Sequence, residues 1–223
     1  WLLPAAGEGY SHLLAAAAIA SMSIGNLGAL NQPDLRRLLA YSGIAQSGFM
    51  LMGVYAAADT GTAATLFYLT LYVPMNLCLF ILADLFTRSS GQQEVTGLTG
   101  LGQLFPWHTA LFTLICVALA GLPPTAGFIA KWNLFVVVLQ HSGGDWPSEP
   151  LILAIVAALN TALSFYYYLK LPGLMVFRSP AAGLAATPAD WRITGLLALL
   201  AVPVLLLGII GFDRLMQYFL QHV

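Results

Sequence analysis

Six long apolar stretches alternate with short polar or Gly/Pro-rich connections along this chain, for example "NQPD", "ADTGT" and "HSGGDWPSEP". A bilayer core about 30 Å thick requires about 20 apolar residues of helix, which every stretch supplies. The stretches are continuous and rich in Ala and Leu, unlike the alternating segments of about ten residues in a membrane barrel. We therefore predict a single all-α integral membrane domain over residues 1–223, with six transmembrane helices at 11–31, 35–57, 62–87, 106–140, 151–171 and 193–212.

Composition agrees with a membrane protein. Of the 223 residues, 59% are hydrophobic and 8% are charged, and the mean hydropathy is +0.83. The net charge is −1 and the basic residues form no cluster, so nothing indicates a nucleic-acid partner. Cys78 and Cys116 have no CxxC or metal-ligand spacing around them and are expected to be small buried hydrophobes. The chain starts at Trp1 without an initiator methionine, so we expect a part of a longer polypeptide.

The connections on alternate sides of six spans differ in their basic residues. One side would carry Arg36, Arg37, Arg88, Lys170, Arg178 and Arg192. The other would carry Arg214 alone, with Glu8, Asp59, Asp145, Glu149 and Asp213. By the positive-inside rule, the arginine-rich loops are expected in the cytoplasm and both termini of this segment on the opposite side of the cell inner membrane. The alternative is that these charges only anchor the topology.

The fourth stretch differs from the others because it is too long and contains helix breakers. A straight helix over 106–140 would be about 52 Å long at about 1.5 Å per residue, well beyond the bilayer core. Within it, the sequence "AGLPPTAGFIAKWNLF" predicts an interruption over 121–127, formed by Gly121, Pro123, Pro124 and Gly127. Discontinuous helices recur at transport sites near the midplane of the membrane, so the break is a functional-site prediction.

Lys131 follows the break, in the first turns of the second half-helix. A lysine at this depth loses hydration, which disfavours its charged form and lets proton gain and release respond to nearby charges. The negative end of the first half-helix, near Ala120, would offset part of that cost. We interpret Lys131 as a proton carrier, because ionisable groups inside a membrane usually mark ion pathways. The alternative is a lysine held permanently in an ion pair with an acid on a neighbouring helix.

Polar side chains elsewhere in the spans are candidates for a proton path beside the lysine: Ser42, Gln46, Tyr72, Asn76, Thr125, Asn160 and Tyr167. Such groups can hold water between helices, but small and polar residues are also the ordinary means by which membrane helices pack closely. Asp84 is expected to pair with Arg88 four residues later. His108 and His141 flank the broken helix, where a solvated histidine is the simpler interpretation than a relay.

Two of these motifs together resemble a known family. "LNQPDLRRLLAYSGIAQSGF" resembles the N-x-K/R-R-x-L-A-Y-S-S-I-x-x-x-G segment, and "AGLPPTAGFIAKW" resembles the G-L/I-P-x-x-x-G-F-x-x-K segment, of the antiporter-like membrane subunits of respiratory complex I. Lysine after a Pro-Pro break is most similar to the N subunit type, called subunit 2 in mitochondria. The sequence differs from the family pattern at Gly43, where serine is common, and at Gln46, where histidine is common.

The resemblance implies a fold and a role. This chain would be the second of two inverted five-helix repeats plus a final helix, and Lys131 would be the lysine of the central hydrophilic axis in this repeat. The other key charged residues of the family would lie upstream of Trp1. NADH, FMN, iron-sulfur clusters and quinone would be carried by partner subunits, and the chain itself would hold no cofactor and no metal.

The sequence thus predicts a proton-translocating membrane-arm subunit of a complex I-type NADH:quinone oxidoreductase, with other membrane-arm subunits and the lipid bilayer as its partners. Two alternatives remain open. One is a subunit of a related cation/proton antiporter or membrane-bound hydrogenase. The other is a structural membrane subunit whose Lys131 is locked in an ion pair.

Overall fold

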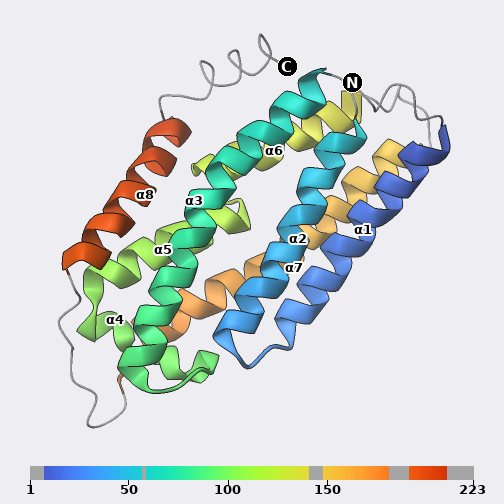
Figure 1. The fold of residues 1–223 in the computed structure, drawn as a ribbon. Coiled ribbons are helices and arrows are strands. Elements are labelled where there is room, and N and C mark those ends of the chain that lie inside the picture. The colour runs from blue at the N-terminus through green and yellow to red at the C-terminus, as the bar shows by residue number, and fades with distance from the viewer. Residues whose placement is uncertain (1–7, 57–58, 141–147, 181–190, 210–223) are drawn as a thin grey trace.

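A computed structural model describes residues 8–56, 59–140, 148–180 and 191–209. These residues form helices in a bundle (Figure 1). In chain order the elements are α1 (Glu8–Leu30), α2 (Leu35–Tyr55), α3 (Asp59–Ser90), a short 3-10 helix η2 (Val95–Leu98), α4 (Leu101–Leu104), α5 (Pro106–Ala120), α6 (Ala126–Gln140), α7 (Glu149–Phe177) and α8 (Trp191–Ile209).

The bundle has two long layers. α1, α2 and α3 lie next to one another, α7 runs behind α1 and α2, and α8 packs against the outer side of α3 (Figure 1). α5 and α6 pass behind α3, and they contact α7 and α3. The buried side chains form one continuous apolar core, in which Phe49, Phe67, Phe86 and Phe112 are among the largest fully buried residues.

The α1–α2 hairpin is tight for two local reasons. Asp34 caps α2, since its carboxylate accepts a hydrogen bond from the Arg37 backbone N–H at 2.8 Å. Farther from the connection, a Cβ atom on Gly25 would lie 2.8 Å from the carbonyl oxygen of Tyr41, so only glycine lets the two backbones approach so closely. The connection between α1 and α2 also pairs with the start of η2, since the Val95 N–H donates to the carbonyl of Pro33 at 2.7 Å.

Within the described ranges, three helices are long and apolar enough, on length and composition alone, to cross a membrane: Tyr10–Leu30, Thr60–Ser90 and Glu149–Phe177. The apolar helices Pro106–Ala120, Ala126–Gln140 and Arg192–Ala201 are shorter. Helix α3 extends past the apolar run 62–87 into the polar residues 88–90, and α7 extends past 151–171 through Pro172 and Gly173 to Phe177. The predicted residues 57 and 210–212 lie outside the described residues.

Candidate functional site

The stretch 106–140 consists of two helices, with residues 121–125 between them. Gly121 ends α5 in the left-handed region, at φ 86° and ψ 43°, where its N–H bonds back to the carbonyls of Val117 and Ala118. Pro123 and Pro124 follow, and Thr125 accepts a hydrogen bond from the Phe128 N–H at 3.3 Å as α6 begins. The connection is shorter than the predicted 121–127.

Gly127 lies in the first turn of α6 and allows that turn to cross the end of α5. A Cβ atom at this position would lie 2.6 Å from the carbonyl carbon of Ala118 and closer still to its oxygen. The two helix ends therefore meet backbone to backbone, which brings the next turn of α6 over the last carbonyl groups of α5.

Lys131 occupies the space that this crossing creates. Its side chain is buried, with 3% of the residue exposed, and Nζ donates to the carbonyl oxygens of Leu119 at 2.9 Å and Ala120 at 3.2 Å. Nζ also lies 4.6 Å from the centre of the Phe49 ring. These carbonyls form the negative end of α5, so carbonyl dipoles and an aromatic face surround the amine. Among the described residues, no carboxylate forms an ion pair with Lys131.

A group of polar side chains from three other helices surrounds this amine. Gln46 of α2 donates from Nε2 to the same Leu119 carbonyl, at 3.2 Å, and to the Tyr168 hydroxyl, at 3.3 Å. Tyr68 of α3 donates its hydroxyl to Gln46 Oε1. Ser42, one turn before Gln46, is buried and donates to the carbonyl of Leu39 at 2.7 Å. We call Lys131, Gln46, Ser42, Tyr68 and Tyr168 the lysine cluster.

A second buried group joins α1 to α7. Asn26 donates from Nδ2 to Asn160, to its side-chain oxygen at 2.9 Å and to its backbone carbonyl at 3.1 Å. The Tyr167 hydroxyl donates to Asn26 Oδ1 at 2.9 Å. Asn160 Nδ2 donates to the carbonyl of Val156 at 2.9 Å, and Ser23 Oγ lies 3.4 Å away. We call Asn26, Asn160, Tyr167 and Ser23 the asparagine cluster. It touches the lysine cluster through the rings of Tyr167 and Tyr168, whose centres are 4.6 Å apart.

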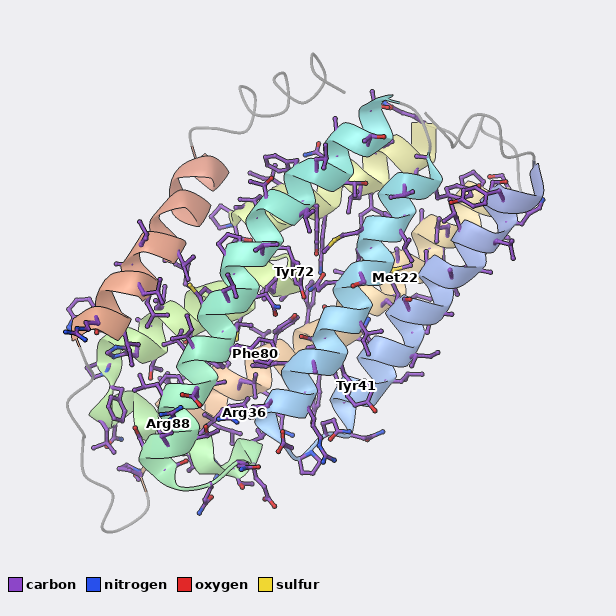
Figure 2. All side chains as sticks on the ribbon, in the orientation of Figure 1. Met22, Arg36, Tyr41, Tyr72, Phe80 and Arg88 are labelled. Atoms are coloured by element: carbon purple, nitrogen blue, oxygen red, sulfur yellow. The ribbon has the colours of Figure 1, made fainter. Side chains whose placement is uncertain are left out.

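The seven path residues predicted from the sequence therefore lie in different places: in the two clusters, at the helix break and on α3. Ser42 and Gln46 belong to the lysine cluster, and Asn160 and Tyr167 to the asparagine cluster. Thr125 donates to the carbonyl of Leu122 at 2.7 Å and shapes the break. The two remaining residues lie on α3 and are half-buried. Tyr72 lies about midway along α3, where its ring stacks against Tyr68 with centres 6.4 Å apart (Figure 2). For Asn76, the described residues supply no hydrogen bond to either cluster.

Sequence reasoning missed Ser23, Asn26, Phe49 and Tyr68 in this region, and it did not propose Tyr168 as a path residue. Tyr68 could have been found because it precedes Tyr72 by one helical turn and so shares its face. Tyr168 is adjacent to a residue that was predicted. Asn26 carries no local signal, since it sits in a run of small residues, and its partner is 134 positions away.

Charged groups mark both ends of the bundle. At one end, Asp84 accepts from Arg36 at 2.6 Å and from Arg88 at 2.7 Å, which confirms the predicted Asp84–Arg88 pair and adds a third member (Figure 2). At the other end, Glu149 contacts His12 at 2.9 Å and accepts from the Tyr55 hydroxyl at 3.2 Å.

The remaining predictions concern histidines, cysteines and metals. His108 Nε2 lies 3.4 Å from Thr194 Oγ1, and His141 is outside the described residues. Cys78 and Cys116 are buried and form no disulfide with each other, as expected for small core residues. In the part of the chain that the structure describes, no group of three or more His, Cys, Asp or Glu side chains could hold a metal ion.

Comparison with known proteins gives a consistent result. The family model described as "NADH:quinone oxidoreductase/Mrp antiporter, TM" matches residues 1–162. NADH-quinone oxidoreductase subunit N of Anaeromyxobacter sp. is 35% identical over 206 residues, which are 92% of this chain and 40% of that protein. NAD(P)H-quinone oxidoreductase subunit 2 of Synechococcus sp. is 35% identical over 202 residues, 89% of this chain and 37% of that protein. The chain thus spans about two fifths of the length of these relatives.

Solved structures show the same arrangement of helices. A chain of respiratory complex I from Thermus thermophilus, with bound Aureothin, is 30% identical with a TM-score of 0.73, over 92% of this chain and 44% of that chain. A chain of the Mrp complex from Dietzia sp. superposes with a TM-score of 0.80 at 24% identity, over 95% of this chain and 46% of that chain.

Proposed function

The chain belongs to the family of membrane subunits that NADH:quinone oxidoreductases share with Mrp antiporters, and on that basis we propose that it forms part of a proton-translocating subunit of a complex I-type NADH:quinone oxidoreductase. In this proposal the chain carries no redox chemistry. Partner subunits hold NADH, FMN, iron-sulfur clusters and quinone, other membrane-arm subunits contact this one, and charge changes transmitted through the assembly drive the protons.

Lys131 is the proposed proton carrier, and its surroundings are the observation that carries the proposal. The amine is buried against carbonyl oxygens and an aromatic ring, and no described acid pairs with it. A protonated amine held only by neutral dipoles is stabilised enough to exist but is not fixed by an opposite charge. Its charge therefore responds to the approach of another charge. This surrounding also argues against the alternative of a lysine locked in an ion pair.

The proposed path is narrower than the set of polar residues that the sequence singles out. Protons reach Lys131 through water beside Ser42, Gln46 and Tyr168, because Gln46 shares the Leu119 carbonyl with Lys131 and bonds Tyr168, and Ser42 lies buried one helical turn before Gln46. Asn160 and Tyr167 instead hold α1 against α7. For Tyr72 and Asn76 a place in the path stays a prediction.

The proposed membrane topology follows the sequence. α1, α2, α3 and α7 each cross the bilayer once, the pair α5 and α6 crosses it together as a discontinuous helix, and α8 makes the sixth crossing. The end that carries Arg36 and Arg88 faces the cytoplasm of a bacterial inner membrane. Cysteine labelling from either side, at position 37 and at position 149, tests this orientation: reagent added outside should reach only position 149.

The proposal is tested by Lys131→Met in the complete subunit, assembled into its complex and reconstituted in vesicles. NADH oxidation should continue at a reduced rate, while the protons pumped per NADH fall. Lys170→Met is the matched control, because the chain has only these two lysines and Lys170 is exposed, 6.0 Å from the Tyr166 ring. Pumping by the Lys131→Met complex equal to that of the control would rule out the carrier role.

The second candidate is a subunit of a cation/proton antiporter, which the likeness to the Mrp chain favours at the level of fold. The same vesicles separate the two functions. A complex I-type subunit pumps protons on addition of NADH and quinone without a sodium gradient. An antiporter subunit moves protons in response to an imposed sodium gradient without NADH.

A further inference from the structure

Gln46 uses both N–H groups and the oxygen of its side-chain amide inside the lysine cluster. The Leu119 carbonyl can only accept, so the amide nitrogen must face it, and the amide oxygen then faces the hydroxyl of Tyr68. The second hydrogen on Nε2 points to the Tyr168 hydroxyl at 3.3 Å. The orientation of this amide is therefore fixed by a backbone group, because reversal would place the amide oxygen against the carbonyl oxygen of Leu119.

Gln46 and Lys131 also share one atom. Gln46 Nε2 and Lys131 Nζ lie 3.2 Å and 2.9 Å from the same carbonyl oxygen of Leu119. Because both nitrogens contact one oxygen, they are at most about 6.1 Å apart, close to the ~4–6 Å range over which an opposite charge strongly favours the charged form of a neighbour. A carboxylate at this position would therefore hold Lys131 as an ion pair.

We propose that Gln46 is a positioning residue for Lys131: its neutral amide satisfies the Leu119 carbonyl and both tyrosine hydroxyls at a place where an acid would fix the ammonium charge. The inference rests on the proposed carrier role of Lys131. Only a carrier must keep the freedom to lose its proton, and a glutamine makes these contacts without adding a charge that opposes this loss.

Few other groups around Gln46 can change charge. Tyr68 and Tyr72 lie on α3, Tyr168 on α7, Cys116 on α5 and Lys131 on α6. α1 carries its titratable residues only among its first five, at the far end of the helix. The lysine is thus the only basic group in this set, so an acid introduced at position 46 would be coupled to it above all.

Gln46→Glu is the decisive variant because it replaces one NH₂ group by an oxygen and leaves the shape unchanged. When the new carboxyl is protonated, its hydroxyl donates to the Leu119 carbonyl and its other oxygen accepts from Tyr68, as the amide does. When it is ionised, it attracts Lys131 and repels that carbonyl. In the assembled complex we expect protons pumped per NADH to approach wild type at acidic pH and to fall at least about tenfold as pH rises, since an opposite charge at this distance shifts a proton equilibrium by that factor or more.

Gln46→Met is the matched uncharged control. It keeps the length of the side chain but loses the hydrogen bonds, so pumping should fall by the same fraction at every pH. Wild-type complex provides the reference profile. If the Gln46→Glu complex follows the wild-type profile, or if it follows the flat profile of Gln46→Met, the positioning role is overturned.

A second measurement separates this inference from the carrier role itself. The infrared band of the new carboxyl, taken as the difference between Gln46→Glu and wild-type complex, reports its ionisation without reference to pumping. We expect a carboxylate at neutral pH when Lys131 is present and a protonated acid when Lys131→Met is added. The same band in both backgrounds overturns the positioning role, even if Lys131 carries protons. If the infrared band changes when Lys131 is replaced but proton pumping does not, the positioning role of Gln46 stands and the carrier role of Lys131 is rejected.

Discussion

The lysine cluster and the asparagine cluster lie next to each other along α7, and they differ in what their hydrogen bonds permit. In the asparagine cluster, neutral amides pair with each other and with one hydroxyl, and the four polar atoms of Asn26 and Asn160 all have partners. In the lysine cluster, an amine that can change its charge is held by carbonyl groups alone. Apart from the half-buried Ser23, the members of both clusters are buried, so the difference is chemical.

That difference shows how to distinguish polar groups that stabilise the fold from polar groups that carry out function inside a membrane. A satisfied neutral network in low dielectric is rigid, because any rearrangement leaves a polar group unpaired. An amine without a counter-ion is sensitive, because any nearby charge changes its protonation. We therefore expect changes in the asparagine cluster to alter stability, and changes around Lys131 to alter pumping.

The largest expected effect tests whether the lysine cluster depends on the backbone crossing. Gly127→Ala places a methyl group against the Ala118 backbone, which cannot move aside as a side chain could. We expect a loss of stability at or above the upper end of the roughly 1–3 kcal/mol usual for overpacking, together with loss of pumping. The measurement is denaturant unfolding of the purified complete subunit. Gly173→Ala is the control, since a Cβ there meets no atom within 4 Å; an equal response of both variants would contradict the role of the crossing.

The break between α5 and α6 and the lysine that follows it are the part of the site that the sequence predicts. Gly121, Pro123 and Pro124 act through local backbone rules, and Lys131 stands out as a charge in an apolar run, so each can be recognised without knowing the fold. Residues that meet across two helices cannot be recognised in this way. Asn26 meets Asn160, and Gln46 meets Tyr168, only because α7 packs behind α1 and α2. The ends of the long helices were also harder to predict, because α3 continues through polar residues to Ser90 and α7 continues through Pro172 and Gly173 to Phe177.

The next effect breaks the asparagine cluster alone. Asn26→Leu leaves the Asn160 side-chain oxygen and the Tyr167 hydroxyl without their partner, at a cost of about 1–3 kcal/mol in unfolding free energy. Adding Asn160→Leu removes the stranded amide, so the double variant should be less destabilised than the sum of the two single variants. Unfolding of all three variants completes the cycle. Proton pumping per NADH should remain at the wild-type value in each complex that assembles; a fall would place this cluster in the path.

A smaller change sharpens the same comparison at the contact between the clusters. Tyr167→Phe removes one hydroxyl and keeps the ring against Tyr168, so we expect a loss of about 0.5–1.5 kcal/mol and unchanged pumping. Tyr168→Phe is the paired variant, because its hydroxyl belongs to the lysine cluster. It should cost a similar free energy but slow pumping. The idea of two functionally separate clusters fails if the two variants pump alike.

The smallest expected effect concerns charges outside both clusters. Asp84 pairs with Arg36 and Arg88, but about a third of its side chain and more of each arginine are open to solvent. Water and salt screen such pairs, so Asp84→Asn should cost about 0.2–1 kcal/mol, and less at high salt. Unfolding at low and high salt measures the difference. If the exposed network tolerates loss of Asp84 while the buried amine does not tolerate an acid beside it, burial rather than the number of ion pairs identifies the charge that matters for pumping. A loss of pumping in Asp84→Asn as large as that in Lys131→Met would break this distinction.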